Sequence, residues 1–229
     1  MTVTNDKTIV KEYFNATGFD RWRRIYGETE DVNKVQKDIR IGHQQTIDTV
    51  IDWLSVDGNL ADISVCDAGC GVGSLSIPLA RMGAMVSASD ISEKMVGEAR
   101  EKAQSLLPES SNIKFEVKDL ESLKGSYHSV ICLDVLIHYP KEDAAEMIAH
   151  LASLAEQRLI LSFAPKTLGL TVLKKIGEFF PGPSKTTRAY QHREAEIISI
   201  LLNNGFHIDR KGMTSTSFYY SRILEAVRD

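Results

Sequence analysis

Residues 65–80 read VCDAGCGVGSLSIPLA, in which an apolar run ends in three glycines at alternate positions and then becomes amphipathic. A buried strand, a glycine-rich turn and a helix form the first unit of many ligand-binding α/β sheets, whose ligands lie at the carboxyl ends of the central strands. Gly69, Gly71 and Gly73 permit unusual φ angles and lack the Cβ atoms that would keep a flat ligand away from the main chain. We therefore place the binding site at this turn.

Short apolar runs alternate with amphipathic stretches along the rest of the chain. Strands are expected at residues 63–68, 85–90, 113–117, 127–135 and 158–164, with helices near 75–82, 93–107, 141–155, 168–179 and 191–204. Repeated strand–helix–strand units imply right-handed crossovers and a parallel sheet. Residues 206–213 and 217–227 follow each other after a short turn and should pair antiparallel. The predicted fold class is α/β: a Rossmann-like doubly wound sheet of about seven strands, mostly parallel, with an antiparallel C-terminal edge hairpin.

The parts of the chain outside this pattern suggest a cap and a lid. Residues 5–55 carry apolar positions at three- and four-residue steps, which predicts helices. We assign residues 1–55 to a helical cap over the cofactor site and residues 56–229 to the α/β domain. Residues 167–190 combine an apolar helical stripe with the break Phe-Pro-Gly-Pro and are assigned to a lid or substrate-binding insertion. An ordinary sheet-covering helix is the alternative for this stripe.

The composition argues against several function classes. The net charge is −4, from 27 basic and 31 acidic side chains, so no overall positive field attracts nucleic acid. The three cysteines are an odd number and indicate reduced thiols in a cytoplasmic protein. No apolar run reaches 18 residues, which predicts at most peripheral membrane association. The six histidines show no paired ligand spacing, so no protein-bound metal is expected.

Three ligand classes compete for the glycine-rich turn. ATP requires a lysine after the last glycine, and none occurs between Ile63 and Lys94. A dinucleotide loop needs GxGxxG, but Ser74 occupies the third glycine position, and a pyrophosphate would lie close to Asp67. S-adenosylmethionine (SAM) carries no phosphate and offers an ammonium group to an acidic neighbour, which Asp67 fits. SAM is therefore the predicted cofactor and methyl donor.

Three further carboxylates end or follow the next strands. Asp90 lies 23 residues beyond Asp67, where a ribose acceptor is expected. Asp119 follows the third strand and is placed to accept from an adenine amino group, and Asp134 ends the fourth strand beside the reacting centre. Each aspartate alone is also a common turn or N-cap residue. Four at successive strand ends predict one shared pocket.

This constellation resembles the class I methyltransferase family, with DAGCGVG at 67–73 as the first motif, KDL at 118–120 as the adenine loop and LDVLIHYP at 133–140 as the fourth motif. The flanks YFNATGFDRWRRIYGE at 13–28, RIGHQQT at 40–46 and FPGPSKTTRAY at 180–190 are similar to the magnesium-protoporphyrin IX methyltransferases of chlorophyll biosynthesis. The resemblance implies methyl transfer from SAM to a propionate of the porphyrin. It implies cofactor binding by Tyr13, Asp67, Gly69, Cys70, Gly71, Asp90, Ile91, Met95, Asp119, Leu120 and Asp134.

The expected chemistry calls for residues that position the substrate. A propionate, with a pKa near ~4.3, is already ionised at neutral pH and needs no general base. We expect His138 to hydrogen-bond the acceptor oxygen or to face the chelated metal, and Tyr26 to hold the substrate from the other side. A helix-capping histidine and a packing tyrosine are the alternatives. Trp22 and Trp53 are interpreted as packing residues. Candidates to meet substrate carboxylates are Lys174, Lys175, Lys185, Arg188 and Arg193, for which a solvated basic face is the alternative.

Two other functions stay open at this point. An O-methyltransferase acting on a phenol or quinone hydroxyl would need His138 as a true base. A catalytically silent cofactor-binding protein would serve as an assembly partner, although the intact Asp67, Asp90 and Asp134 argue against it. The family resemblance further suggests contact with the large subunit of magnesium chelatase and loose attachment to photosynthetic membranes.

Overall fold

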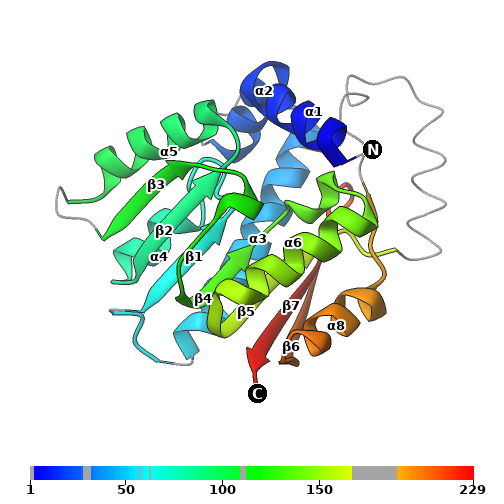
Figure 1. Ribbon diagram of the computed structural model, residues 1–229. Helices are drawn as coiled ribbons and strands as arrows, with labels where there is room; N and C mark the ends of the chain where they lie inside the picture. Colours follow the sequence, from blue (N-terminus) through cyan, green and yellow to red (C-terminus); the bar gives the residue numbers. More distant parts are fainter. Residues whose placement is uncertain (1–2, 28–31, 57, 62, 109–111, 167–189) are drawn as a thin grey trace.

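A seven-stranded sheet forms the centre of the computed structural model, which describes residues 3–27, 32–56, 58–61, 63–108, 112–166 and 190–229 (Figure 1). The expected helix near 168–179, almost all of the expected lid, and Lys174, Lys175, Lys185 and Arg188 lie outside the described residues. The strand order is β3-β2-β1-β4-β5-β7-β6. The strands are β1 (Ser64–Ala68), β2 (Met85–Asp90), β3 (Ile113–Val117), β4 (Tyr127–Cys132), β5 (Ala155–Phe163), β6 (Phe206–Ser215) and β7 (Tyr220–Arg228).

The pairing of these strands confirms the predicted fold class. Strands β1 to β5 are mutually parallel, whereas β7 pairs antiparallel with both β5 and β6. The chain runs outward from β1 through β2 to β3 and then returns to place β4 on the other side of β1. The carboxyl ends of β1 and β4 therefore flank a topological switch point, which is where open α/β sheets bind their ligands.

Helices cover both faces of the sheet. The helices α3 (Lys34–Val56), α4 (Ser76–Arg81) and α5 (Glu93–Leu106) bury apolar side chains in one core cluster with the sheet. The helices α6 (Lys141–Leu154) and α8 (Glu194–Asn203) do so on the opposite face, which is turned to the viewer in Figure 1. Burial of an apolar stripe on each helix is the main driving force for this layered arrangement. Two 3₁₀ turns, η1 (Leu120–Ser122) and η2 (Leu136–His138), follow β3 and β4.

The first two helices, α1 (Val3–Asn15) and α2 (Thr17–Tyr26), lie together at the top of Figure 1. Helix α1 contacts α5, and α2 contacts both α3 and α5. Arg40 of α3 fixes the end of α2, because its Nε donates to the carbonyl of Ile25 (2.8 Å) and its Nη2 to that of Arg24 (2.6 Å). A cation at these carbonyls also meets the negative end of the helix dipole. The expected helical preamble thus divides into a pair of capping helices and α3, which belongs to a sheet-covering layer.

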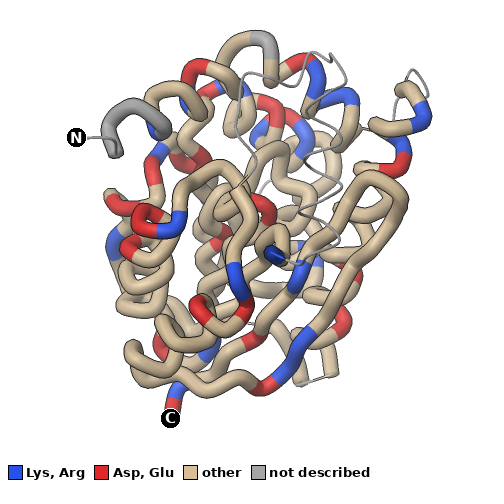
Figure 2. The backbone as a smooth tube through the Cα atoms, turned by 90° about the vertical axis from the view of Figure 1, so that its right-hand side faces the viewer, with Lys and Arg blue, Asp and Glu red and all other residues tan. Residues whose placement is uncertain are grey.

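Most charged side chains lie at the surface, but a few carboxyl groups are buried, and one of them is Glu225. Basic and acidic segments are interspersed on the side of the molecule shown in Figure 2. Glu225 of β7 is fully buried between Arg158 of β5 (Nε to Oε1, 2.9 Å) and Arg210 of β6 (Nη2 to Oε1, 3.0 Å). Among the described helices, none combines the length and hydropathy needed to span a bilayer.

Candidate active site

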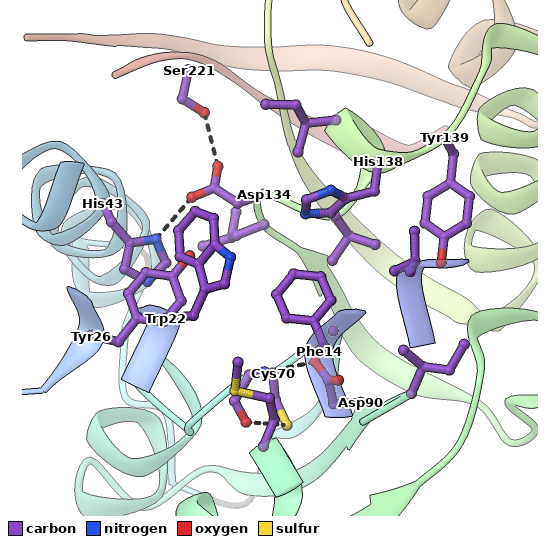
Figure 3. Close-up of a pocket in the computed structure, with 18 of the residues that line it drawn as sticks. Phe14, Trp22, Tyr26, His43, Cys70, Asp90, Asp134, His138, Tyr139 and Ser221 are labelled. Atoms are coloured by element: carbon purple, nitrogen blue, oxygen red, sulfur yellow. Dashed lines mark hydrogen bonds and ion pairs between the residues drawn. The ribbon is translucent and has the colours of Figure 1, made fainter. Parts of the chain in front are cut away.

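A cavity of about 350 Å³ lies where the capping helices meet the carboxyl ends of the strands (Figure 3). The glycine-rich turn, the ends of β2 and β4, η2 and the start of β7 line it from the sheet side. Phe14, Trp22 and Tyr26 line it from the capping helices. An apolar and aromatic wall with a few convergent polar groups is typical of a site for a small organic ligand. The structure therefore has a cavity of this kind at the predicted position.

The glycine-rich turn is held open by its backbone. Gly69 has φ 87° and Gly71 has φ 52°, both in the left-handed region that favours glycine. The N–H groups of Gly69 and Cys70 both donate to the carbonyl of Ser89 (2.8 Å each), which ties the turn to β2. A Cβ on Gly69 would collide with Val135 at 2.1 Å, whereas a Cβ on Gly71 would meet no atom within 4 Å. Gly69 is thus required for packing, and Gly71 leaves main chain accessible to a ligand.

Asp90 lies at the end of β2, beside this turn, and lines the cavity. Its Oδ2 accepts from the N–H of Gly71 (3.0 Å) and its Oδ1 from that of Ser92 (2.8 Å). Burial raises the pKa of Asp90, although these backbone hydrogen bonds act in the opposite direction. A carboxylate can accept about four hydrogen bonds, so Asp90 can still accept from a ligand in the cavity. The position is the one expected of the predicted ribose acceptor.

Most of the residues predicted to bind the cofactor line the cavity, and two do not. The lining includes Gly69, Cys70, Gly71, Asp90, Ile91, Met95, Asp119, Leu120 and Asp134. Asp67 instead lies beneath the turn with 3% exposure and accepts a hydrogen bond from Ser76. Burial raises the pKa of Asp67 to about 6. Tyr13 packs edge-on against Phe14, with ring centroids 5.2 Å apart. Cofactor contacts by Asp67 and Tyr13 stay predictions.

Asp134 anchors the most densely hydrogen-bonded part of the site. The residue has φ 58°, a conformation that is rare for a residue with a side chain. Its carboxylate contacts the hydroxyl of Tyr219 (2.7 Å), Nδ1 of His43 (2.8 Å), and the hydroxyls of Ser162 (3.0 Å) and Ser221 (3.4 Å). Burial alone would raise the pKa of Asp134, but the hydrogen bonds outweigh it and hold the pKa below its usual value. Asp134 is therefore a partly buried anion at neutral pH.

His43 and Tyr219 are site residues that the sequence reasoning missed. They come from α3 and from the residue before β7, and both reach Asp134 from segments that are remote in the sequence. On its other side, the His43 ring lies against Tyr26, with centroids 4.3 Å apart and planes inclined by 37°. Burial and the nearby Asp134 charge keep the pKa of Tyr26 well above its ordinary value, so the phenol is protonated at neutral pH.

Two polar nitrogens of the cavity wall have no hydrogen-bond partner in the described part of the chain. They are Nε1 of Trp22 and Nδ1 of His138, both inaccessible to solvent. Burial lowers the pKa of His138 to about 4, so its imidazole is neutral at physiological pH. The ring lies edge-on to Phe14 at 5.2 Å. Because unpaired buried polar atoms are costly, these two nitrogens indicate that the cavity receives a ligand with polar groups of its own. Trp22 thus lines the site, although the sequence reasoning assigned it to packing.

The comparisons with known proteins agree with this geometry. Residues 132–228 match the family model described as "Magnesium-protoporphyrin IX methyltransferase C-terminus", and residues 65–157 match a methyltransferase domain. The chain is 71% identical over 224 residues to magnesium-protoporphyrin O-methyltransferase of Synechocystis, which covers 98% of this chain and 97% of that protein. The chain belongs to the magnesium-protoporphyrin O-methyltransferase family. Within this family it is also 61% identical over 222 residues to the chloroplastic protein of Arabidopsis thaliana, covering 97% of this chain and 71% of that one.

A solved structure from the magnesium-protoporphyrin O-methyltransferase family has the same fold. The Synechocystis crystal structure, which is described as having bound SAH, aligns with a TM-score of 0.91 at 70% identity. The alignment covers 97% of this chain and all of that one (100%). The family resemblance expected from the sequence motifs is therefore confirmed.

Proposed function

We propose that this protein transfers the methyl group of SAM to a propionate carboxylate of magnesium-protoporphyrin IX, giving the monomethyl ester and S-adenosylhomocysteine in chlorophyll biosynthesis. The 71% identity to the Synechocystis enzyme over nearly the whole of both chains carries this conclusion. The cavity supports it independently, because Gly71 leaves main chain open beside Asp90 and the walls are largely apolar and aromatic. Such walls suit a wide, flat ring system.

The cofactor fits the residues at the floor of the cavity. We propose that Asp90 accepts from the ribose hydroxyls and Asp119 from the adenine amino group. Asp119 is half-exposed beside the cavity, and one of its oxygens already accepts from the N–H of Ser122 (3.0 Å). The cofactor supplies a methyl group on a positively charged sulfur. The predicted ammonium partner, Asp67, is separated from the cavity by the glycine-rich turn, and ionisation of its carboxyl group would accompany any approach of that charge.

The transfer itself requires alignment and not proton movement. A propionate oxygen forms the new bond to the methyl carbon while the carbon–sulfur bond breaks, so one negative and one positive charge disappear together and no proton is released. A preorganised, water-poor site accelerates such a step mainly by orientation. We propose that His138, neutral and unpartnered at Nδ1, positions the acceptor oxygen and that Tyr26, still protonated, holds the substrate from the opposite wall.

The pH dependence of turnover tests the identity of the acceptor. Because the pKa of His138 is lowered to about 4, this group does not titrate between about pH 8 and about pH 6.5, and a propionate stays ionised over the same range. We expect kcat with magnesium-protoporphyrin IX to change less than about twofold over that range. A methyl-transfer assay that offers the porphyrin beside a catechol gives the comparison. Preferential methylation of the catechol, with a rate that falls about tenfold per pH unit, would contradict the proposal.

Two features of cellular context are proposed on the family resemblance alone. They are contact with the large subunit of magnesium chelatase and peripheral attachment to photosynthetic membranes. Basic and acidic residues are interspersed on the side of the molecule shown in Figure 2, so a polar contact with limited area is the form we propose for either. Co-sedimentation with thylakoid-lipid vesicles and a pull-down with the purified chelatase subunit would test them. Absence of retention in both experiments at low ionic strength would contradict these proposals.

A cap made by residues 1–55 and a lid made by residues 167–190 also stay proposals.

A further inference from the structure

The cavity wall contains a cationic side chain that forms no ion pair within the described part of the chain. Among the described residues that line the cavity, Arg21 provides the only lysine or arginine side chain, against the carboxylates Asp90, Asp119, Glu121 and Asp134. We propose that Arg21 and Nε1 of Trp22 form a subsite for the propionate that is not methylated. This inference rests on the proposed function and identifies how the substrate is recognised.

The surroundings of Arg21 differ from those of its two neighbours in α2. Arg23 forms an ion pair with Glu98 of α5 (3.5 Å), and Arg24 donates to the carbonyl of Asp20 (3.1 Å) and points to solvent. No carboxylate of the described chain forms an ion pair with Arg21, which is partly buried at the cavity. Its guanidinium carbon lies 5.8 Å from the centroid of the Trp22 ring. A guanidinium held over an aromatic face is preorganised to bind a planar anion.

Trp22 adds a second and independent indication of an acceptor at this place. Its Nε1 is buried at the cavity and donates to no described atom. Figure 3 shows the indole nitrogen turned toward the side of the cavity where Phe14 and His138 lie. An indole N–H is a donor only, so the ligand group that pairs with it must be an acceptor. A carboxylate oxygen satisfies the indole N–H and the guanidinium fork at the same time.

The charges of the substrate call for such a subsite. Magnesium-protoporphyrin IX carries two propionates, both ionised at neutral pH. The reacting propionate lies opposite the positive sulfur of the cofactor, which balances its charge. The second propionate would otherwise enter a cavity that contains several carboxylates, and an unpaired buried charge is strongly unfavourable. Arg21 is the described group that can balance it.

This assignment has a consequence for specificity. The product retains only one carboxylate, so a second methylation would require the new ester to lie against Arg21 while the remaining propionate reacts. That arrangement leaves a guanidinium without its anion and is disfavoured. Arg21 therefore favours the diacid over the monoester as the substrate of methyl transfer, and it limits the reaction to one methyl group.

Binding titrations of two porphyrins test the subsite without depending on turnover. The absorbance change of magnesium-protoporphyrin IX and of its dimethyl ester, which has no free carboxylate, is followed for wild type, Arg21→Gln, Arg21→Lys, Trp22→Phe and the control Arg24→Gln. We expect Arg21→Gln to weaken diacid binding about tenfold, to leave binding of the dimethyl ester nearly unchanged, and so to reduce the preference for the diacid. Arg21→Lys should retain part of this preference. Trp22→Phe should also reduce the preference. The effects of Trp22→Phe and Arg21→Gln should not add in the double variant, because both groups contact one carboxylate.

The possible failures are distinguishable. A ratio of diacid affinity to dimethyl-ester affinity in Arg21→Gln equal to that of wild type, or a loss of equal size in Arg24→Gln, would overturn the subsite while leaving the proposed function intact. A weakened affinity for SAM in Arg21→Gln would place Arg21 at the cofactor and would also overturn it. If wild type neither binds nor methylates the porphyrin, the proposed function itself fails. Prolonged incubation gives an additional measurement, since Arg21→Gln is expected to form more diester than wild type.

Discussion

At the scale of single residues, Asp134 combines backbone strain with a dense set of hydrogen bonds. A non-glycine residue at φ 58° is unfavourable by about 1 to 3 kcal/mol, and it persists where surrounding contacts determine it. Here His43 and Tyr219 supply such contacts from two different elements. Because the His43 ring also lies 4.3 Å from the ring of Tyr26, the Asp134 carboxylate indirectly sets the position of a proposed substrate-holding residue. His43 is thus a positioning residue.

Substituting His43 separates its two contacts. The side-chain N–H of asparagine replaces Nδ1 of histidine, so His43→Asn keeps the hydrogen bond to Asp134 and loses the ring beside Tyr26. We expect kcat to fall about tenfold while SAM affinity and melting temperature stay near those of wild type. His43→Phe keeps a ring but removes the donor, and it should lower the free energy of unfolding by about 1 to 3 kcal/mol. Full activity in His43→Asn would show that Tyr26 does not depend on this ring.

The sequence predicted the acidic half of the site and not the groups that hold it. Asp90 and Asp119 could be located because each follows an apolar run that is legible as a strand, and carboxyl ends of parallel strands meet at one edge. His43 and Tyr219 lie 91 and 85 residues from Asp134 along the chain, so no local pattern marks their contact. Trp22 was assigned to packing for a different reason, because a lone aromatic residue in a helix is most often a core residue.

At the scale of elements, the strands were the most predictable part of the fold. Strands β2 and β3 begin and end at the residues expected from their apolar runs, because turns and polar residues bound them on both sides. The N-terminal helices were less predictable. Helix α1 ends at Asn15, and Gly18 then lies so close to Tyr13 that a Cβ on Gly18 would be 2.5 Å from the Tyr13 ring, a close approach that no periodicity reveals. What the sequence could not show is which helix covers the sheet and which covers the site.

The antiparallel edge depends on a charge in its interior. Glu225 is fully buried, and neutralising its carboxylate removes the charge that pairs with both Arg158 and Arg210. We expect Glu225→Gln to lower the free energy of unfolding by about 3 to 5 kcal/mol in urea denaturation. Glu156→Gln, at an exposed position of β5, is the matched control and should change it by less than about 0.5 kcal/mol. Equal midpoints for the two variants would show that the buried pairs contribute no net stability.

At the scale of the whole molecule, one hydrogen-bonded chain joins the cofactor site to the capping helices. Asp90 accepts from the N–H of Ser92, and the Ser92 hydroxyl lies 3.1 Å from the carbonyl of Phe14 and 3.0 Å from Oδ1 of Asn15. Asn15 Oδ1 also accepts from the N–H of Lys94 (3.3 Å). A ligand that orders Asp90 therefore stabilises the docked position of α1 and α2, and by linkage the docked helices strengthen ligand binding.

Hydrogen exchange measures this linkage directly. We expect saturating SAM to slow amide exchange in α1 and α2 of the wild-type protein by about tenfold, because opening of these helices then competes with binding. In Asn15→Ala this slowing should be several-fold smaller, whereas exchange in β4 and β5 should be the same in both proteins. The matched control is Asn203→Ala, which alters an exposed asparagine at the end of α8. Identical SAM-induced protection of α1 and α2 in Asn15→Ala and wild type would contradict the linkage.

The hydrogen-bond partners of Asp134 become available in a fixed order when the chain is synthesised on the ribosome. These partners are spread from His43 to Ser221, so the strained residue has no complete set of partners until translation has passed the start of β7. Until then a nascent chain exposes the aromatic faces of Phe14, Trp22 and Tyr26, which are surfaces that chaperones bind. The capping helices are therefore synthesised well before the last contacts of the pocket that they cover.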